Sequence, residues 1–211
     1  QKWGDTAIGL RAVATGGNAT ALGRSARAAA ENAIAIGGGN GNSFNNNTEK
    51  TEASADKATA IGYNAKATAG DTLALCTSSK ASGSDVLAIG KNANASNSDS
   101  IAIGQDTVSN KINSVALGKT SQATGASATA LGPQAKATGS TAVAIGLNSE
   151  ANQSATVAVG YNSAASGENA AAYGNTAKAA GKNSLALGAN TQATVEGGVA
   201  LGAGSIANTV A

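Results

Sequence analysis

The side chains that could do chemistry in this chain are suited to binding rather than to catalysis. The 211-residue sequence contains no histidine and one cysteine, Cys76. Without histidine, a Ser-His-Asp triad and a zinc site of cysteine and histidine are both excluded. The acidic residues are scattered at expected turns, as Asp71, Asp85 and Glu168 illustrate. We therefore expect no catalytic residue, no cofactor and no metal site, and we expect that the protein is not an enzyme.

Basic residues recur at one place in a repeated pattern and are the strongest candidates for ligand binding. On a shared outward face they would form a cationic ladder that meets an anionic matrix or cell-surface polymer. The simpler interpretation, which we favour, is a solvated face that also resists sheet-edge aggregation. The net charge of +2 gives no indication of nucleic-acid binding. The candidate residues are Arg27, Lys66, Lys80, Lys136 and Lys178.

A 14-residue repeat must position these side chains. Segments such as Val143-Ala144-Ile145-Gly146 recur fourteen times. Twelve of the thirteen intervals between their closing residues are 14 residues, and the interval from 37 to 62 is 25, which is 14 plus 11. A fixed period across the whole chain indicates stacked units rather than a globular core. The closing residues are 9, 23, 37, 62, 76, 90, 104, 118, 132, 146, 160, 174, 188 and 202.

Each repeat carries the alternating pattern of two short β-strands. With the closing residue numbered zero, position −1 is large, position −2 is always Ala, and position −3 is mostly Val, Ile, Leu or Thr. Positions +3 and +5 are small, whereas position +4 is mostly polar or charged. This period of two predicts a first strand at −4 to −1 and a second strand at about +3 to +6. Gly and Asn between them indicate tight turns, and their fixed recurrence argues against helix.

Two strands in 14 residues cannot fold alone, so we predict that the repeats stack into two parallel sheets. The rise would be about 4.8 Å per repeat. The first strand is apolar on both faces and is expected to be covered on both. We place positions −1 and −3 inside the roll and the Ala of position −2 at an interface in an obligate oligomer. The interface candidates are Ala102, Ala116, Ala130, Ala144 and Ala158.

The repeat resembles the head domain of YadA-like trimeric autotransporter adhesins. The family motif is close to Asn-Ser-Val-Ala-Ile-Gly followed by Ser, Ala and Gly at fixed spacing. Here Asn113-Ser114-Val115-Ala116-Leu117-Gly118 is followed by Ser121, Ala123 and Gly125, and residues 183–188 match nearly as well. The resemblance covers residues 4–208. It implies an all-β, left-handed parallel β-roll of about fourteen coils in a homotrimer, which makes the alanine interface a trimer interface.

The resemblance also implies a function at the surface of a Gram-negative bacterium. Such heads bind host extracellular-matrix proteins such as collagen, fibronectin or laminin, or mediate autoaggregation. We expect one head domain over residues 1–211, without neck, stalk or membrane anchor, so that attachment to the outer membrane lies outside this segment. No 18-residue apolar run is present, and this segment is not expected in the membrane. A ligand-free spacer or phage-type fibre segment remains open as an alternative, and an ice-binding solenoid is less favoured.

Three features depart from the repeat. Residues 38–48 are an insertion rich in Gly and Asn, predicted to form a surface loop between coils. Its Phe44 is a candidate aromatic contact for a ligand, although we favour a tolerated surface decoration. Cys76 replaces the closing Gly, which we interpret as a simple substitution rather than a reactive thiol. Trp3 is expected to cap the first coil.

Overall fold

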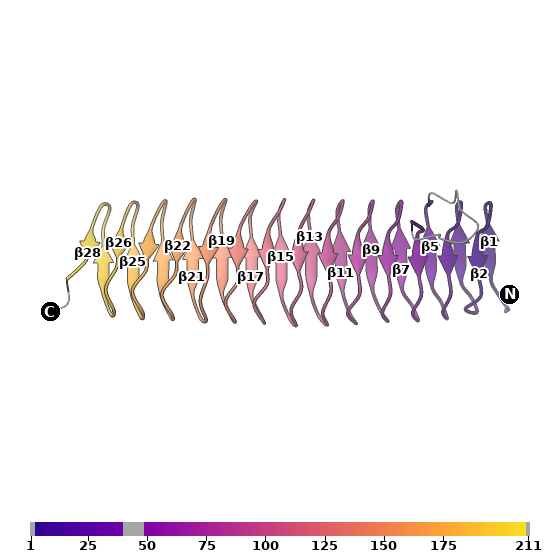
Figure 1. Cartoon of the computed structure of the whole chain (residues 1–211), viewed down its shortest axis with the longest axis horizontal. Coiled ribbons are helices and arrows are strands. Elements are labelled where there is room, and N and C mark those ends of the chain that lie inside the picture. The colour runs from indigo at the N-terminus through magenta and orange to yellow at the C-terminus, as the bar shows by residue number, and fades with distance from the viewer. Residues whose placement is uncertain (1–2, 40–48, 210–211) are drawn as a thin grey trace. The chain divides into compact units, whose positions relative to one another are not determined.

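The computed structural model describes residues 3–39 and 49–209, and in these residues it consists of short β-strands and turns (Figure 1). The chain divides into two compact units, residues 1–106 and 107–211. Each unit is a stack of coils in which every 14-residue repeat contributes one first strand and one second strand. The all-β parallel solenoid of about fourteen turns predicted from the sequence is confirmed. Within the described residues there is no helix that could cross a bilayer.

Unit 1 contains two parallel sheets that alternate along the chain. Its first-strand sheet has three-residue strands, namely β1 (Thr6–Ile8), β3 (Thr20–Leu22), β5 (Ile34–Ile36), β7 (Thr59–Ile61), β9 (Leu73–Leu75), β11 (Leu87–Ile89) and β13 (Ile101–Ile103). Its second-strand sheet has two-residue strands, namely β2 (Val13–Ala14), β4 (Arg27–Ala28), β6 (Glu52–Ala53), β8 (Lys66–Ala67), β10 (Lys80–Ala81) and β12 (Asn94–Ala95).

Unit 2 repeats the same plan. Its first-strand sheet contains β15 (Val115–Leu117), β17 (Thr129–Leu131), β19 (Val143–Ile145), β21 (Val157–Val159), β23 (Ala171–Tyr173), β25 (Leu185–Leu187) and β27 (Val199–Leu201). Its second-strand sheet contains β14 (Val108–Ser109), β16 (Gln122–Ala123), β18 (Lys136–Ala137), β20 (Glu150–Ala151), β22 (Ala164–Ala165), β24 (Lys178–Ala179), β26 (Gln192–Ala193) and β28 (Ile206–Ala207).

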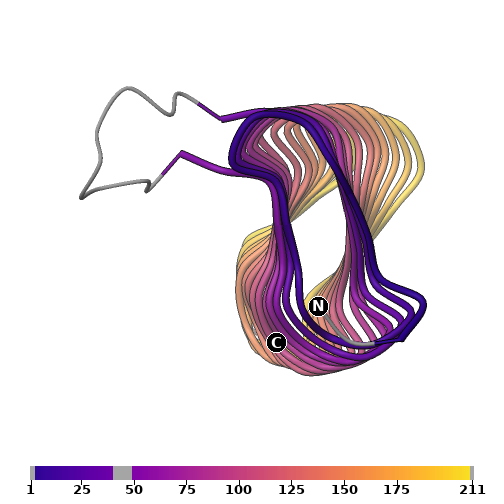
Figure 2. The same ribbon diagram turned by 90° about the vertical axis from the view of Figure 1, so that its right-hand side faces the viewer.

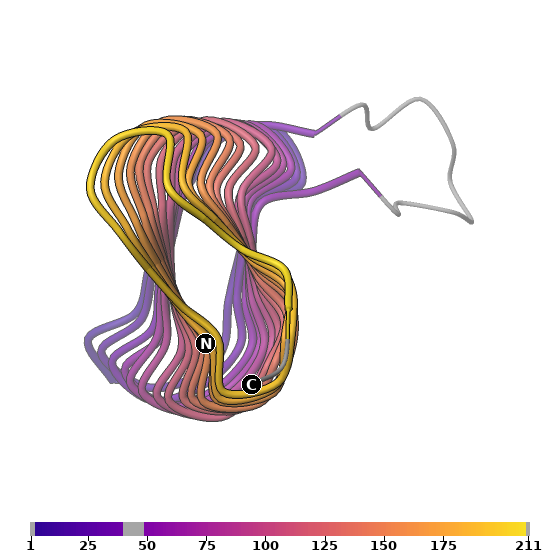
Figure 3. The ribbon, with the colours of Figure 1, turned by 90° about the vertical axis from the view of Figure 1, so that its left-hand side faces the viewer.

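Identical positions of successive repeats pair in register within each unit. In unit 2, Ala144 pairs with Ala130 on one side and with Ala158 on the other. Views along the coil axis show each coil as two legs joined by turns (Figures 2 and 3). Because side chains alternate between faces, a slip of one residue would exchange the inward and outward sets. The fixed period therefore stacks side chains of one kind into columns.

The turns explain why Gly closes most repeats. Gly146 has φ of +122°, and a Cβ there would lie 2.6 Å from the carbonyl oxygen of Gly160 in the next coil. An L-residue would meet both backbone strain and a clash at this position. Cys76 takes the closing position with φ of +99°, and it is exposed. Two residues after the closing position, Asn148 and Asn162 adopt φ of +59° and +53°, a conformation that Asn tolerates well.

The core consists of alanine, and this corrects the orientation predicted for the first strand. The proposed interface residues Ala102, Ala116, Ala130, Ala144 and Ala158 are all 0% exposed within the single chain. They lie inside the roll, so they are not available to a partner. Buried alanines of both sheets line this interior, as Ala144 and Ala137 show, so the space between the sheets is narrow. Methyl groups fill this space, whereas Ile or Leu would force the two sheets apart.

The large aliphatic residues of the first strand face outward instead. Leu117 and Leu131, both at position −1, are 39% exposed, and Leu187 is 42% exposed. Position −3 is half-buried on the same side, as Val143 and Val157 show. The first-strand sheet of unit 2 therefore carries an outward face that is mostly aliphatic, with Thr129 and Tyr173 as exceptions. Trp3 is 96% exposed, so the prediction that it caps the first coil is wrong.

The second strand has the orientation predicted from its sequence. Ala81 and Ala137, at position +5, are 0% exposed, while Lys80 and Lys136 beside them point outward. At position +3, Ser and Thr share the interior because their hydroxyl groups bond to turn carbonyls. Ser149 Oγ, for example, donates to the carbonyl oxygen of Gly146 at 3.0 Å. A satisfied hydroxyl costs little to bury, so small polar side chains are tolerated in this thin core.

Candidate functional site

The outward face of the second-strand sheet carries the basic residues that the sequence singled out. In unit 1 the column at position +4 runs through Arg27, Glu52, Lys66 and Lys80, each on a strand paired with the next. Arg27, Lys66 and Lys80 thus share one face, as expected. Glu52 interrupts this set, because it follows the insertion and returns to position +4. The column is a mixed ladder rather than an uninterrupted cationic one.

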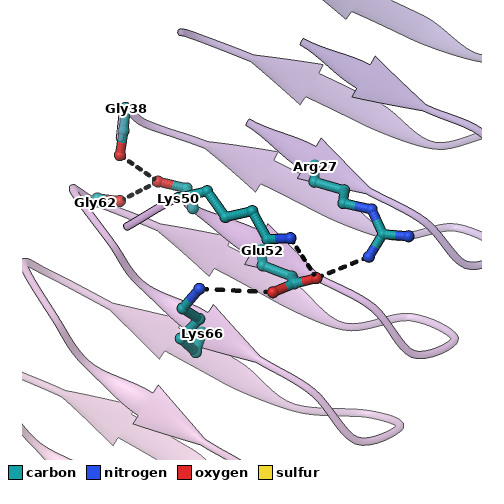
Figure 4. A network of polar contacts seen from close by, with 7 residues as sticks. Arg27, Gly38, Lys50, Glu52, Gly62 and Lys66 are labelled. Carbon is teal, nitrogen blue, oxygen red and sulfur yellow. Dashed lines mark hydrogen bonds and ion pairs between the residues drawn. The ribbon is translucent and has the colours of Figure 1, made fainter. Parts of the chain in front are cut away.

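Glu52 is the centre of a network of ion pairs (Figure 4). Its Oε1 atom lies 2.8 Å from Arg27 Nη1 and 3.4 Å from Lys50 Nζ. Its Oε2 atom lies 3.5 Å from Lys66 Nζ. Three cations surround one carboxylate, so the cluster keeps an excess of positive charge. Removing Glu52 would leave three like charges facing one another.

Burial and charge act against each other in this network. Burial opposes ionisation of Glu52, but the hydrogen bond from Arg27 and the charges of Lys50 and Lys66 outweigh it, so the pKa of the carboxyl group lies below its ordinary value. Burial also lowers the pKa of the Lys66 amine, although the carboxylate of Glu52 opposes this effect. Glu52 is therefore an anion at neutral pH, and it holds the neighbouring side chains in place.

The residues at the two ends of the insertion form hydrogen bonds close to the Glu52 network. Gly38 and Gly39 keep the usual turn hydrogen bonds, from Asn64 N to Gly38 O and from Gly39 N to Arg24 O. Thr51 is fully buried, and its Oγ1 atom lies 3.1 Å from Gly38 O and 2.5 Å from Gly62 O. By this register the 11 extra residues are 40–50, two positions later in the sequence than the predicted 38–48. The regular coil is restored within one turn, so the insertion leaves the solenoid register intact.

In unit 2 the column at position +4 has a smaller share of charged residues. Lys136 Nζ lies 3.0 Å from Glu150 Oε1, so the first of its two lysines is paired. Lys178 is flanked by Ala164 and Gln192 in the column. Within residues 3–39 and 49–209 no carboxylate forms an ion pair with Lys178. The five predicted ligand-binding cations therefore have unequal surroundings. Phe44 lies outside the described residues.

Two of the open grooves on the surface of the described residues differ in chemistry. The groove in unit 1 has a volume of about 450 Å³, and Lys57, Asp71 and Asp85 are among its lining residues. The groove in unit 2 has a volume of about 360 Å³ and is lined only by Asn162, Thr176, Lys178, Asn190 and Gln192. No group of three or more His, Cys, Asp or Glu side chains that could hold a metal ion occurs among the described residues.

Sequence reasoning missed Lys50 and Glu52, both central to the network of unit 1. The signal was available once the 11 extra residues are removed from the interval between 37 and 62. Glu52 then aligns with Arg27 and Lys66 as an acidic member of the column. Opposite charges at adjacent positions of paired strands attract one another, which favours this pairing.

Nine stretches of the chain match the YadA head domain repeat, and together they span most of its length. This chain belongs to the YadA head family. The class of protein is therefore the adhesin head with a repeated β-roll that the sequence motif indicated. The matched stretches are residues 4–26, 14–40, 53–75, 81–107, 95–121, 109–135, 123–149, 151–177 and 179–205.

The match to the YadA head repeat stops on either side of the insertion and resumes in the same register. No curated protein matches the chain. Among solved structures, the chain is similar to the collagen-binding domain of the Yersinia adhesin YadA, a crystal structure. The identity is 24% and the TM-score 0.36, over 74% of this chain and 72% of that one.

Proposed function

We propose that this YadA head binds host extracellular-matrix proteins of the collagen, fibronectin or laminin class at the bacterial surface. The observation that supports the proposal is the YadA head repeat, which occupies residues from 4 to 205 with few gaps. A roll with an alanine core has no deep pocket of its own among the described residues. Ligand contact therefore falls to the outward side chains of the second-strand sheet, and cell-to-cell autoaggregation would use the same exposed surface.

The basic residues of unit 1 are the proposed contacts. Arg27 is 43% exposed at its side chain despite its bond to Glu52, and Lys80 is exposed at the same face. Exposed cations attract acidic stretches of a large partner over several ångströms and lose this attraction in salt. The proposed binding is thus electrostatic in part, and it should weaken as the ionic strength rises.

Solid-phase binding of the purified chain to collagen, fibronectin and laminin tests this proposal. We expect saturable binding to at least one of the three proteins. The double variant Arg27→Gln and Lys80→Gln should weaken it by about tenfold, since exposed charge pairs contribute up to about 1 kcal/mol each. Lys91→Gln, which removes the same charge from a turn, serves as the matched control. A head that binds none of the three would instead be a ligand-free spacer or a fibre segment.

We further propose that the head is a homotrimer whose chains meet at the outward aliphatic face. Leu117, Leu131 and Ile145 present large apolar groups on one side of unit 2, and no part of the described chain covers them fully. Exposed apolar surface of this extent is typical of an interface between chains. Three identical chains would bury it around a common axis, which closes the assembly.

Sedimentation equilibrium tests the assembly. We expect the mass of three chains for the natural protein and of one chain for the double variant Leu131→Asp and Ile145→Asp. Carboxylates placed opposite one another in an apolar interface cost several kcal/mol, which is enough to separate the chains. Retention of the β-sheet circular dichroism would show that the variant still folds. A variant that keeps the mass of three chains would exclude this face as the interface.

A further inference from the structure

The groove of unit 2 is lined by residues with polar side chains and by no acidic residue, unlike the groove of unit 1. Its volume is about 360 Å³, within the range of pockets that bind small ligands. Three of its residues, Asn162, Thr176 and Asn190, stand at the same turn position of three successive coils. The other two, Lys178 and Gln192, stand at position +4 of two coils. The groove thus has two parallel rows of polar side chains.

Most of these side chains are free to bind a ligand. Thr176 Oγ1 is within hydrogen-bond distance of Asn190 Oδ1, so this bond uses the acceptor oxygen of Asn190 and not its amide N–H donors. Asn162, Lys178 and Gln192 make no side-chain hydrogen bond or ion pair with any residue that the structure describes. The groove therefore offers amide donors and acceptors together with one ammonium group whose charge is not neutralised.

The backbone N–H groups of the groove are engaged in the coil stack. Thr176 N donates to Tyr161 O, Asn190 N donates to Asn175 O, and Lys178 N donates to Thr191 O. A peptide that adds a strand would need free backbone groups, and a peptide side chain would favour an apolar pocket. The groove offers no free backbone N–H group, and its lining residues are all polar. The alternative partner is one whose own surface consists of hydroxyl groups.

We propose that this groove binds a carboxylated sugar. Vicinal hydroxyl groups would bond to the amides of Asn162, Asn190 and Gln192, and the carboxylate would lie against Lys178 Nζ. The coils repeat every 4.8 Å or so along the groove, which presents similar donors to successive parts of a saccharide. The groove of unit 1 has two carboxylates, Asp71 and Asp85, against one cation, Lys57, and this excess of negative charge would repel the same ligand. This inference stands apart from the binding of matrix proteins.

Isothermal titration calorimetry with the full chain tests the proposal. The probes are 3′-sialyllactose and a hyaluronan tetrasaccharide, which separate sialic acid from uronic acid, and lactose is the neutral reference. We expect one of the two acidic probes to bind at least tenfold more tightly than lactose. Lys178→Gln should weaken that binding by about tenfold, because it removes a charge-assisted hydrogen bond. Asn162→Gly, which keeps the positive φ, should weaken it as well.

Lys136→Gln is the matched control, since Lys136 occupies the same column but is paired with Glu150. It should leave binding unchanged within about twofold. The proposal would be overturned if neither acidic probe bound, if Lys178→Gln had no effect, or if polyglutamate bound as tightly as the acidic sugar. Binding of the same variants to collagen, fibronectin and laminin would separate a failure of the groove from a failure of the matrix adhesin.

Discussion

The two sheets of each unit have the same interior and opposite exteriors. Inside, Ala144 of the first strand and Ala137 of the second strand are both 0% exposed. Outside, the neighbours of Ala144 are Val143 and Ile145, whereas the neighbour of Ala137 is Lys136. One face suits self-association and the other suits solvent or a charged ligand. A 14-residue repeat thus gives its two sheets different exteriors by the choice of residue at only a few positions.

The largest expected effect comes from overfilling the shared interior. Ala144→Leu and Ala137→Leu should each lower the free energy of unfolding by about 1–3 kcal/mol, because the thin core cannot take three more heavy atoms without moving the sheets. Lys136→Leu should change it by less than about 0.5 kcal/mol, since the side chain points outward. Urea denaturation measures all three. Tolerance of Ala144→Leu alone would show that the first strand has the opposite orientation.

A smaller effect is expected at the turn that joins the two sheets. Cys76 is an L-residue with φ of +99° at a position that is Gly in the other thirteen repeats. Cys76→Gly should raise the free energy of unfolding by about 1 kcal/mol. Glycine relieves the backbone strain of the folded chain, but it also makes the unfolded chain more flexible, which offsets part of the gain. Gly146→Ala is the mirror variant and should lower it by about 2 kcal/mol. Thermal denaturation would contradict the account if Cys76→Gly were destabilising.

The smallest effect concerns the polar exterior of unit 1. The pKa of Glu52 is lower in the folded chain than its ordinary value of 4.5. Its contribution to stability is therefore complete above pH 4.5 and is lost as the pH falls through the lower folded value. Glu52→Gln should lower stability at pH 7 by about 1 kcal/mol and should flatten the acid limb of the stability profile. An unchanged acid limb would mean that the network does not stabilise the fold.

The repeat, the strands and the turns could be predicted because each depends on local sequence. The alternation of small and polar residues orients the second strand, as Lys136 and Ala137 show. The first strand has no such signal, since Leu185, Ala186 and Leu187 make both faces apolar. Its orientation follows from the width of the roll, which is a property of two strands together. For this reason the alanines were wrongly assigned to the interface.

The candidate site could be predicted in part for the same reason. Position +4 faces outward, so Arg27, Lys66 and Lys80 were correctly placed on one surface. The pairing of Arg27 and Lys66 with Glu52 depends on how the chain returns from the insertion, which the local sequence pattern does not describe. The polar groove of unit 2 joins turn residues to strand residues of neighbouring coils. Such a juxtaposition appears only when the coils are stacked.

Cross-linking of two adjacent residues tests the central claim most directly. In a Cys76→Gly background, which removes the exposed natural thiol, Ala144→Cys and Ile145→Cys would each be treated with a short bis-maleimide. The account predicts cross-linked chains from Ile145→Cys, because that side chain faces outward to a partner, and none from Ala144→Cys, whose side chain lies inside the roll. Cross-linked chains from Ala144→Cys, with none from Ile145→Cys, would contradict it.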